Sequence, residues 1–245
     1  MTVVFSGNGM SLAVADMLGG NPAGADSLGF VFPVYGWRIP KILRRRIREG
    51  FGDFRPSFTW AVMTCGDDVG MADEDLEREL RASAGVGLDA AYSVVMPDTY
   101  IGLPGFSVDS DEEARAKTDA ARGRCREIAA ALAERRCTRD LRRGRFAAAK
   151  TRVAGALFDR LFANDRLFRV DASKCTGCGR CAAECPTDSI LSGPGGVPSW
   201  RRSGGCTACF HCCHACPAAA IESGPFTRGK RRLGVSTCAF RVSSV

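Results

Sequence analysis

The 245-residue sequence contains no apolar run of about twenty residues, and no charged and apolar leader with a small-residue cleavage site opens it. These absences predict a chain that neither crosses a membrane nor is exported, and we expect a soluble, cytoplasmic protein. The glycine turn near the start, Gly7-Asn8-Gly9, is not a nucleotide-binding loop of a known type. No Gly-Lys-Ser/Thr follows it, and Leu12 replaces the third glycine of the dinucleotide fingerprint. No separate nicotinamide-binding fingerprint is visible.

Cysteine, in contrast, is abundant, with thirteen residues in the chain. Eight of them form the same pattern twice, C-x2-C-x2-C-x3-C-P, which is the run that bacterial ferredoxins use to hold two [4Fe–4S] clusters. In such runs three close thiolates bind one cluster, and the fourth reaches the other. The assignment is therefore Cys175, Cys178, Cys181 and Cys216 for one cluster, and Cys206, Cys209, Cys212 and Cys185 for its partner.

The spacing has a steric reason, because one short loop must reach three iron atoms of one cluster. Small residues between the thiols also leave backbone N–H groups free to point at sulfur. A zinc site would leave half of the thiols unused, and a disulfide framework needs an oxidising compartment. The residues after Pro186 and Pro217 are expected to start short helices. We expect His211 and His214, which flank the second cluster, to face solvent. The other five cysteines are expected to be inert: Cys65, Cys125, Cys137, Cys213 and Cys238.

The first half of the chain alternates apolar strands with helices, which predicts a parallel sheet with helices on both faces. The expected strands are residues 2–6, 28–34, 58–65 and 90–96, and the expected helices are residues 12–18, 73–84, 109–136 and one that begins at Pro40. Ligands bind such sheets at the carboxyl ends of the strands. Three loops lie there: the glycine turn, the aromatic loop from Tyr35 to Arg38, and the Gly/Asp loop from Gly66 to Gly70.

Taken together, these segments resemble a family of flavodoxin–ferredoxin fusions, the ferrodoxin family. The resemblance rests on F-S-G-x-G-x-S, F-V-F-P-V-Y-x-W, T-C-G and M-P-D-x-Y-I, followed by the two cysteine runs, in the same order. It implies an α/β flavodoxin-like doubly wound parallel sheet, with strand order 2-1-3-4-5, and a small α+β bacterial 2[4Fe–4S] ferredoxin domain. It also implies FMN at the three loops, held by Ser6, Gly7, Asn8, Gly9, Met10, Ser11, Val34, Tyr35, Gly36, Trp37, Thr64, Cys65, Gly66 and Asp67.

One departure from this family concerns the glycine turn, which normally reads S-G-T-G-N-S. Asn8 replaces the threonine and Met10 replaces the asparagine. Asn8 can still donate an N–H, but Met10 cannot. Losing one hydrogen bond to a charged group costs roughly 1.5–3 kcal/mol, so we expect weaker FMN binding.

The domain boundaries follow from these segments. We expect a flavodoxin-like domain over residues 1–136, a basic amphipathic helical connector over 137–168, a two-cluster ferredoxin domain over 169–224 and a basic tail without clear periodicity over 225–245. The segment from Arg135 to Arg152 has eight basic residues and one acidic residue. Its excess of seven positive charges equals the net charge of the whole chain, +7. This local excess indicates contact with an acidic redox partner or a membrane surface, and argues against nucleic acid. The alternative is that the connector's apolar face packs between the domains.

The sequence therefore predicts an iron–sulfur flavoprotein that transfers electrons between two clusters and FMN. The cofactors carry this reaction, so no residue need act as an acid, base or nucleophile. Two alternatives stay open. One is a flavin-dependent reductase of a small molecule, and the other is a ferredoxin whose flavodoxin-like domain binds no flavin and serves for docking.

Overall fold

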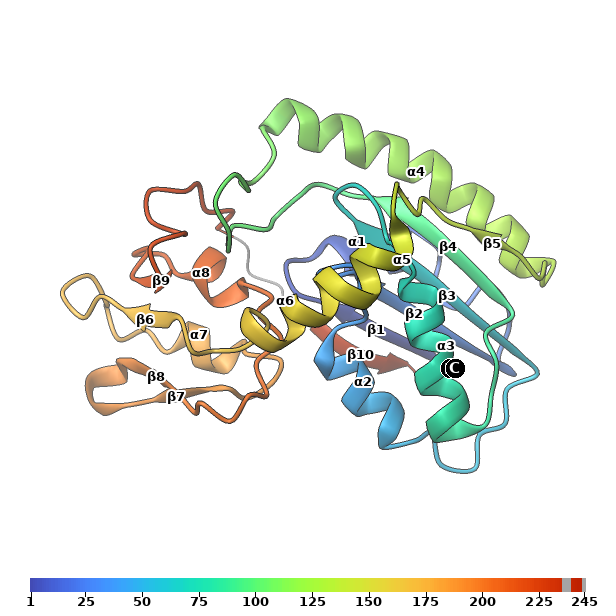
Figure 1. Cartoon of the computed structure of the whole chain (residues 1–245), viewed down its shortest axis with the longest axis horizontal. Coiled ribbons are helices and arrows are strands. Elements are labelled where there is room, and N and C mark those ends of the chain that lie inside the picture. The colour runs from blue at the N-terminus through green and yellow to red at the C-terminus, as the bar shows by residue number, and fades with distance from the viewer. Residues whose placement is uncertain (235–238, 244–245) are drawn as a thin grey trace.

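The structure is a computed structural model, and it describes residues 1–234 and 239–243. Its larger part is a six-stranded sheet covered by helices, and its smaller part contains the cysteine runs (Figure 1). The elements of the larger part, up to the connector, are β1 (Thr2–Ser6), α1 (Met10–Met17), β2 (Ser27–Pro33), α2 (Lys41–Arg48), β3 (Phe58–Cys65), α3 (Ala72–Ala84), β4 (Ala90–Val95), α4 (Asp111–Ala133) and β5 (Arg139–Asp140).

The remaining elements belong to the connector, the smaller part and the tail. A continuous helical segment consists of α5 (Ala147–Ala149), the π-helical turn η1 (Lys150–Ala154) and α6 (Gly155–Leu161). Then follow β6 (Phe168–Val170), α7 (Arg180–Ala183), β7 (Ile190–Ser192), η2 (Pro194–Gly196), β8 (Pro198–Trp200), α8 (His211–Ala215), β9 (Ile221–Ser223) and β10 (Ala239–Ser243). In the smaller part β6 pairs with β9 and β7 with β8, both antiparallel.

The sheet is buried on both faces because its strands alternate apolar side chains between two cores. Val3 and Phe5 of β1 face one core, which α2 and α3 cover, whereas Val4 faces the other, which α1 and α4 cover. Such two-sided burial explains why the strands are apolar throughout. Gly29 is needed for packing, because a Cβ there would lie 2.2 Å from the Trp60 ring. The prediction of an α/β sheet with helices on both faces is confirmed.

The predicted strand order, 2-1-3-4-5, is not the observed one. The order is β10-β1-β2-β3-β4-β5, in which β1 to β5 are parallel and follow chain order. The reason is the length of the link after α1: residues 18–26 form glycine- and proline-rich turns and contain no further strand. The chain therefore enters β2 directly beside β1, and the outer edge of β1 is free for β10, which pairs with it antiparallel.

Two segments of the chain contribute to the sheet although the sequence predicts otherwise. Residues 139–140, within the expected connector, form the edge strand β5. The tail, for which no regular element is expected, contributes β10. The structure does not describe residues 235–238, so the expectation for Cys238 lies outside the described residues.

Candidate functional site

The eight repeated cysteines line two cavities of the smaller part. Cys175, Cys178, Cys181 and Cys216 line the first cavity, and Cys185, Cys206, Cys209 and Cys212 line the second. The fold therefore brings the fourth cysteine of each run to the first three of the other run. All cysteines of the described residues are free thiols. Within the described chain no three ligand side chains converge closely enough for a single metal ion. Each set of four thiols instead surrounds a space, as the corners of one cluster require.

The two cysteine runs share one backbone conformation. Positive φ angles recur at equivalent positions of the two copies: Gly177 and Ala208, Gly179 and Phe210, and Asp188 and Ala219. At Asp188 and Ala219 this conformation interrupts the predicted helices after the prolines, so that expectation is wrong. Each turn instead directs a backbone N–H group at a cysteine sulfur. The Ser189 N–H donates to Cys185 Sγ at 3.3 Å, and the Ala220 N–H donates to Cys216 Sγ at 3.3 Å.

The two cavities differ in their exposure to solvent. In the first, Cys178 is exposed, and hydrogen bonds from the Arg180 N–H and from Thr176 lower the pKa of its thiol. In the second, burial raises the pKa of Cys206 far above its ordinary value. The aromatic residues Phe168, Trp200 and Phe210 line this second cavity and make its lining more apolar. A bound metal deprotonates a thiol outright, so both cavities suit thiolate ligands.

His211 and His214 are buried, so the prediction that they face solvent is wrong. His211 Nε2 lies 2.5 Å from a Glu184 carboxylate oxygen. His214 Nε2 lies 2.8 Å from the Thr99 carbonyl oxygen, and its Nδ1 faces the Leu233 N–H at 3.4 Å. Burial lowers the pKa of His214 to about 4. A neutral ring that donates from Nε2 and accepts at Nδ1 satisfies both contacts. Through this hydrogen bond to Thr99, His214 connects the second cysteine run to the loop after β4.

A third cavity, of about 380 Å³, lies at the carboxyl ends of β1 to β4. It is within the usual size range of cofactor sites. Of the fourteen residues expected at FMN, thirteen line it; the exception is Gly9, which precedes α1 with a φ of 87°. Further lining residues, mostly from the loop after β4 and from the connector, are Pro33, Asp68, Met96, Pro97, Asp98, Thr99, Tyr100, Leu103, Phe106, Lys150 and Phe158.

The glycine turn of this cavity presents buried polar atoms that lack a partner. Ser6 Oγ and Asn8 Oδ1 are both buried and make no hydrogen bond. Ser11 Oγ lies 2.7 Å from Thr64 Oγ1, at the start of α1. Unsatisfied buried polar atoms are rare in folded proteins and are typically explained by a ligand or water. The Ser6 hydroxyl can therefore donate to an anionic group, such as a phosphate, at the N-terminus of α1. Asn8 Oδ1 is an acceptor and needs a donor, because the Asn8 amide N–H group already donates to Thr99 and Cys209.

Aromatic rings also line the third cavity. Tyr35 packs edge-on against Phe5 at 6.2 Å between ring centroids. Tyr100 makes edge contacts with Phe106 and Phe158, at 5.4 and 6.0 Å. The Tyr100 contacts join the loop after β4 to α6. Aromatic faces around a concave site suit a planar ring system.

The connector contributes to the cavity in a way that sequence reasoning missed. Lys150 of η1 reaches into it, with Nζ 2.5 Å from an Asp68 carboxylate oxygen and 5.4 Å from the Trp37 ring centroid. Phe158 of α6 lies on the Gly36 turn, where a Cβ on Gly36 would approach its ring to 2.6 Å. No sequence pattern links positions 36 and 158, since only the fold brings them together. Asp67, by contrast, is exposed and pairs with Arg142 at 2.9 Å.

The second and third cavities adjoin each other. The Asn8 side-chain amide donates to the Cys209 carbonyl oxygen at 3.1 Å and to Thr99 Oγ1 at 3.2 Å. A Cβ on Gly7 would lie 2.8 Å from the Cys209 Cβ. Tyr100 also meets Phe210 edge-on at 5.3 Å. The glycine turn thus rests directly on the loop that carries the second set of thiols.

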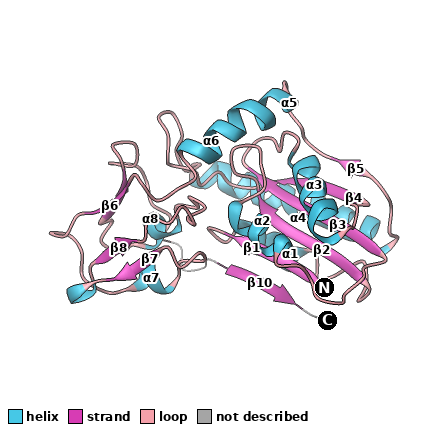
Figure 2. Cartoon of the chain, turned by 60° about the horizontal axis from the view of Figure 1, so that its bottom comes forward, coloured by secondary structure: helices cyan, strands magenta, loops and turns pink. Residues whose placement is uncertain are grey.

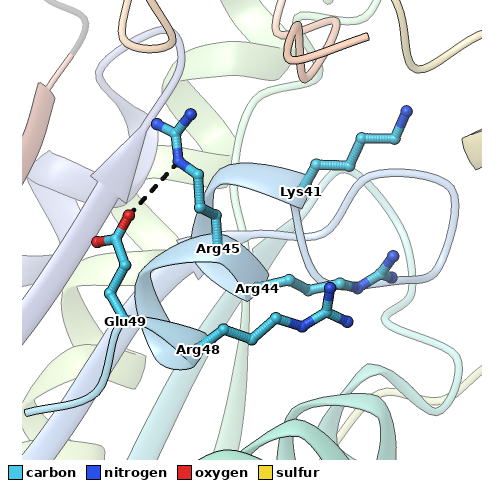
Figure 3. A pocket seen from close by; sticks show the side chains of 5 residues that line it. All are labelled: Lys41, Arg44, Arg45, Arg48 and Glu49. Atoms are coloured by element: carbon cyan, nitrogen blue, oxygen red, sulfur yellow. Dashed lines mark ion pairs between the residues drawn. The ribbon is translucent and has the colours of Figure 1, made fainter.

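Another cavity lies along α2 and is lined by Lys41, Arg44, Arg45, Arg48 and Glu49 (Figure 3). Its cations already have partners. Arg44 pairs with Asp75 and Asp159, both at 2.7 Å, and Arg48 pairs with Glu79 at 2.8 Å. Lys41 donates to the Ala163 carbonyl oxygen at 2.5 Å. The cationic side chains of this groove therefore serve ion pairs and hydrogen bonds within the protein.

Comparison with known proteins identifies one segment. Residues 168–191 match the family described as the 4Fe-4S binding domain. Searches among curated proteins and among solved structures returned no match. The chain thus contains a ferredoxin-type 4Fe–4S binding segment, which supports a role in iron–sulfur electron transfer. Among the described residues, no helix is long and apolar enough to cross a membrane.

Proposed function

We propose that the chain is an electron-transfer flavoprotein that holds two [4Fe–4S] clusters and one FMN. The observation that carries this proposal is the set of three cavities, of which the second and third adjoin each other. Two are lined by four cysteines each, and the third lies at the strand ends with buried, unsatisfied polar atoms. When bound, the clusters would supply single-electron transfer, and FMN would exchange one or two electrons.

Within this proposal each set of residues has a role. Cys175, Cys178, Cys181 and Cys216 hold one cluster, and Cys206, Cys209, Cys212 and Cys185 hold the other. The Ser189 and Ala220 N–H groups, which donate to ligand sulfurs, stabilise the thiolates and help set the reduction potentials. The aromatic rings of the second cavity make the surroundings of its cluster more apolar.

The flavin part of the proposal rests on the third cavity. The glycine turn, Ser11 and the start of α1 hold the phosphate, and the aromatic loop with Tyr100 encloses the ring system. The sheet itself supports a flavodoxin-like architecture. If the antiparallel β10 takes the place of the second strand, β1 to β4 occupy the four remaining places of the order 2-1-3-4-5, and β5 adds a further strand at the far edge. We infer that β10 has replaced the usual edge strand beside β1, while the carboxyl ends of the parallel strands still form the ligand-binding side of the sheet.

The contacts also favour an order of the sites. The second cavity touches the glycine turn through Cys209, whereas the first has the exposed Cys178. We therefore propose that the external redox partner meets the chain at the first cluster, and that the second cluster connects it to the flavin.

The test is to purify the chain without oxygen and to measure iron, sulfide and released FMN per chain. We expect about eight irons with one FMN. Eight irons without FMN, even after incubation with excess FMN, would remove the flavin from the proposal and favour the docking alternative. Reoxidation of bound flavin by a small-molecule substrate, in the absence of any partner, would favour the reductase.

A further inference from the structure

The connector carries a row of large apolar side chains on its outer side. Val153, Leu157 and Leu161 recur at every fourth residue of η1 and α6, and Phe146 precedes them. Their exposed fractions are 68, 54, 49 and 74% respectively. We call these four residues the connector ridge. A helix that is apolar on its outer as well as its inner side is normally covered on both.

The inner side of the same helix is held firmly, so the helix cannot turn to bury the ridge. The Thr151 hydroxyl donates to the Trp37 carbonyl oxygen at 3.0 Å and accepts the Met71 N–H at 2.8 Å. A Cβ on Gly155 would lie 2.4 Å from the Gly36 carbonyl oxygen. The expectation that the connector's apolar face packs between the domains thus describes Phe158 and the inner side but not the ridge.

Most of the basic run identified in the sequence is neutralised within the protein. Arg135, Arg136, Arg139, Arg142, Arg143 and Lys150 all have acidic partners in the sheet domain. Arg152 is two-thirds exposed and reaches Glu74 only at 3.7 Å. Arg145 and Arg160 are exposed and have no acidic partner among the described residues. Arg145 and Arg160 therefore leave unneutralised positive charge directly next to ridge residues in the chain, and the exposed Arg166 follows the helix.

The exposed apolar ridge and its neighbouring arginines together indicate what kind of surface binds the ridge. A second copy of the chain would bring the same arginines together, and like charges at short distance are unfavourable. Figure 2 shows α5 and α6 at the periphery of the molecule, and the four ridge side chains are about half to three quarters exposed. An exposed apolar row bordered by arginines is the pattern of helices that lie in the interface of an anionic bilayer.

We propose that the connector ridge docks the protein onto an anionic membrane surface. Phe146, Val153, Leu157 and Leu161 enter the boundary between headgroups and acyl chains, while Arg145 and Arg160 bind lipid phosphates. The helix lies on the bilayer and does not cross it. Because the inner side of the same helix lines the third cavity, docking would place that cavity near the membrane.

The test uses the full chain loaded with its clusters and measures co-sedimentation with vesicles. One set contains equal amounts of phosphatidylglycerol and phosphatidylcholine, and the other contains phosphatidylcholine alone. We expect binding to the first set, weaker binding to the second, and a decrease with added salt. Arg145→Gln with Arg160→Gln should weaken binding about 30-fold. Val153→Ser with Leu157→Ser and Leu161→Ser should weaken it roughly a hundredfold.

Matched controls separate the ridge from general surface properties. Leu191→Ser removes an exposed leucine of β7, and Arg122→Gln removes an exposed arginine of α4. Both should bind vesicles as the unchanged chain does, and the cluster absorbance of every variant checks folding. Equal binding to both vesicle sets, or ridge variants that bind normally, would overturn the proposal. Binding to polyglutamate without binding to either vesicle set would also overturn the proposal, and would instead indicate an acidic protein partner.

Discussion

At the scale of single residues, Gly7 lies where the two parts of the molecule touch. A Cβ at this position would come within 2.4 Å of Tyr35 Oη and 2.8 Å of Cys209 Cβ. Neither neighbour can move easily, because Tyr35 packs on Phe5 and Cys209 lines the second cavity. The position therefore has no room for any side chain, although its φ angle does not require glycine.

We expect Gly7→Ala to lower the free energy of unfolding by about 1–3 kcal/mol, because the added methyl group overpacks this contact. Gly123→Ala is the matched control. It makes the same change inside α4, where a Cβ meets nothing within 4 Å, and should stabilise by roughly 0.5–1 kcal/mol. Thermal unfolding of the two variants checks both signs. Equal shifts would contradict the close approach.

Met10 is the residue of the glycine turn that cannot donate a hydrogen bond. It begins α1 and lines the third cavity. We expect Met10→Asn to tighten FMN binding by about tenfold or more, because one hydrogen bond to a charged group contributes roughly 1.5–3 kcal/mol. Met17→Asn, at the other end of the same helix and away from the cavity, should leave the affinity unchanged. Titration of FMN into flavin-depleted protein measures the difference.

At the scale of elements, one buried carboxylate joins three helices. Asp75 of α3 accepts from Arg38 at 3.1 Å and from Arg44 of α2 at 2.7 Å, and both arginines also reach Asp159 of α6. Burial alone would raise the pKa of Asp75, but the bonds from Arg38 and Arg44 outweigh it and lower the pKa below its ordinary value. The ionised carboxylate therefore holds the connector to the sheet domain through the two arginines.

The pH dependence follows from that direction. A carboxyl group with a lowered pKa stabilises the fold above its unfolded pKa of about 3.9, and this contribution is lost as the pH falls through the folded pKa. Asp75→Asn should lower the free energy of unfolding at pH 7 by about 1.5–3 kcal/mol, because Arg38 and Arg44 lose one of their two carboxylates and keep only Asp159. The difference from the unchanged chain should shrink below about pH 4.

Urea unfolding at several pH values, followed by far-UV circular dichroism, measures this effect. Asp111→Asn is the control, since Asp111 pairs with Arg231 at the surface and should contribute little. A constant difference between Asp75→Asn and the unchanged chain down to low pH would contradict the account.

At the scale of the whole molecule, the two cysteine runs exchange their fourth members. Cys216 lies in the cavity of the first run, although it belongs to the second in sequence. We expect Cys216→Ala to impair the same cluster as Cys175→Ala, with the loss of up to about half the iron. Electron paramagnetic resonance of the reduced protein should give matching spectra for these two variants, and a different one for Cys206→Ala. A match between Cys216→Ala and Cys206→Ala would contradict the crossed assignment.

Local patterns in the sequence determined much of the architecture. The strands at residues 2–6 and 58–65 were predicted with the observed bounds, because an unbroken apolar run between turns has few other structures. The cysteine spacing indicated the 4Fe–4S segment, since three ligands of one cluster must come from one short loop. Loops at the carboxyl ends of parallel strands meet at one edge, so thirteen of fourteen expected residues line one cavity.

Only the tertiary structure decided features that depend on contacts between distant segments. Asn8 and Cys209 are 201 residues apart, and their hydrogen bond leaves no trace in either local pattern. The same holds for Lys150 in the third cavity, for the burial of His214 against Thr99, and for β10 at the edge of β1. The interpretation of the basic run also changes, because acidic residues from other segments of the chain pair with most of its cations. Sequence spacing determines which residues a loop can present, but packing determines what those residues meet.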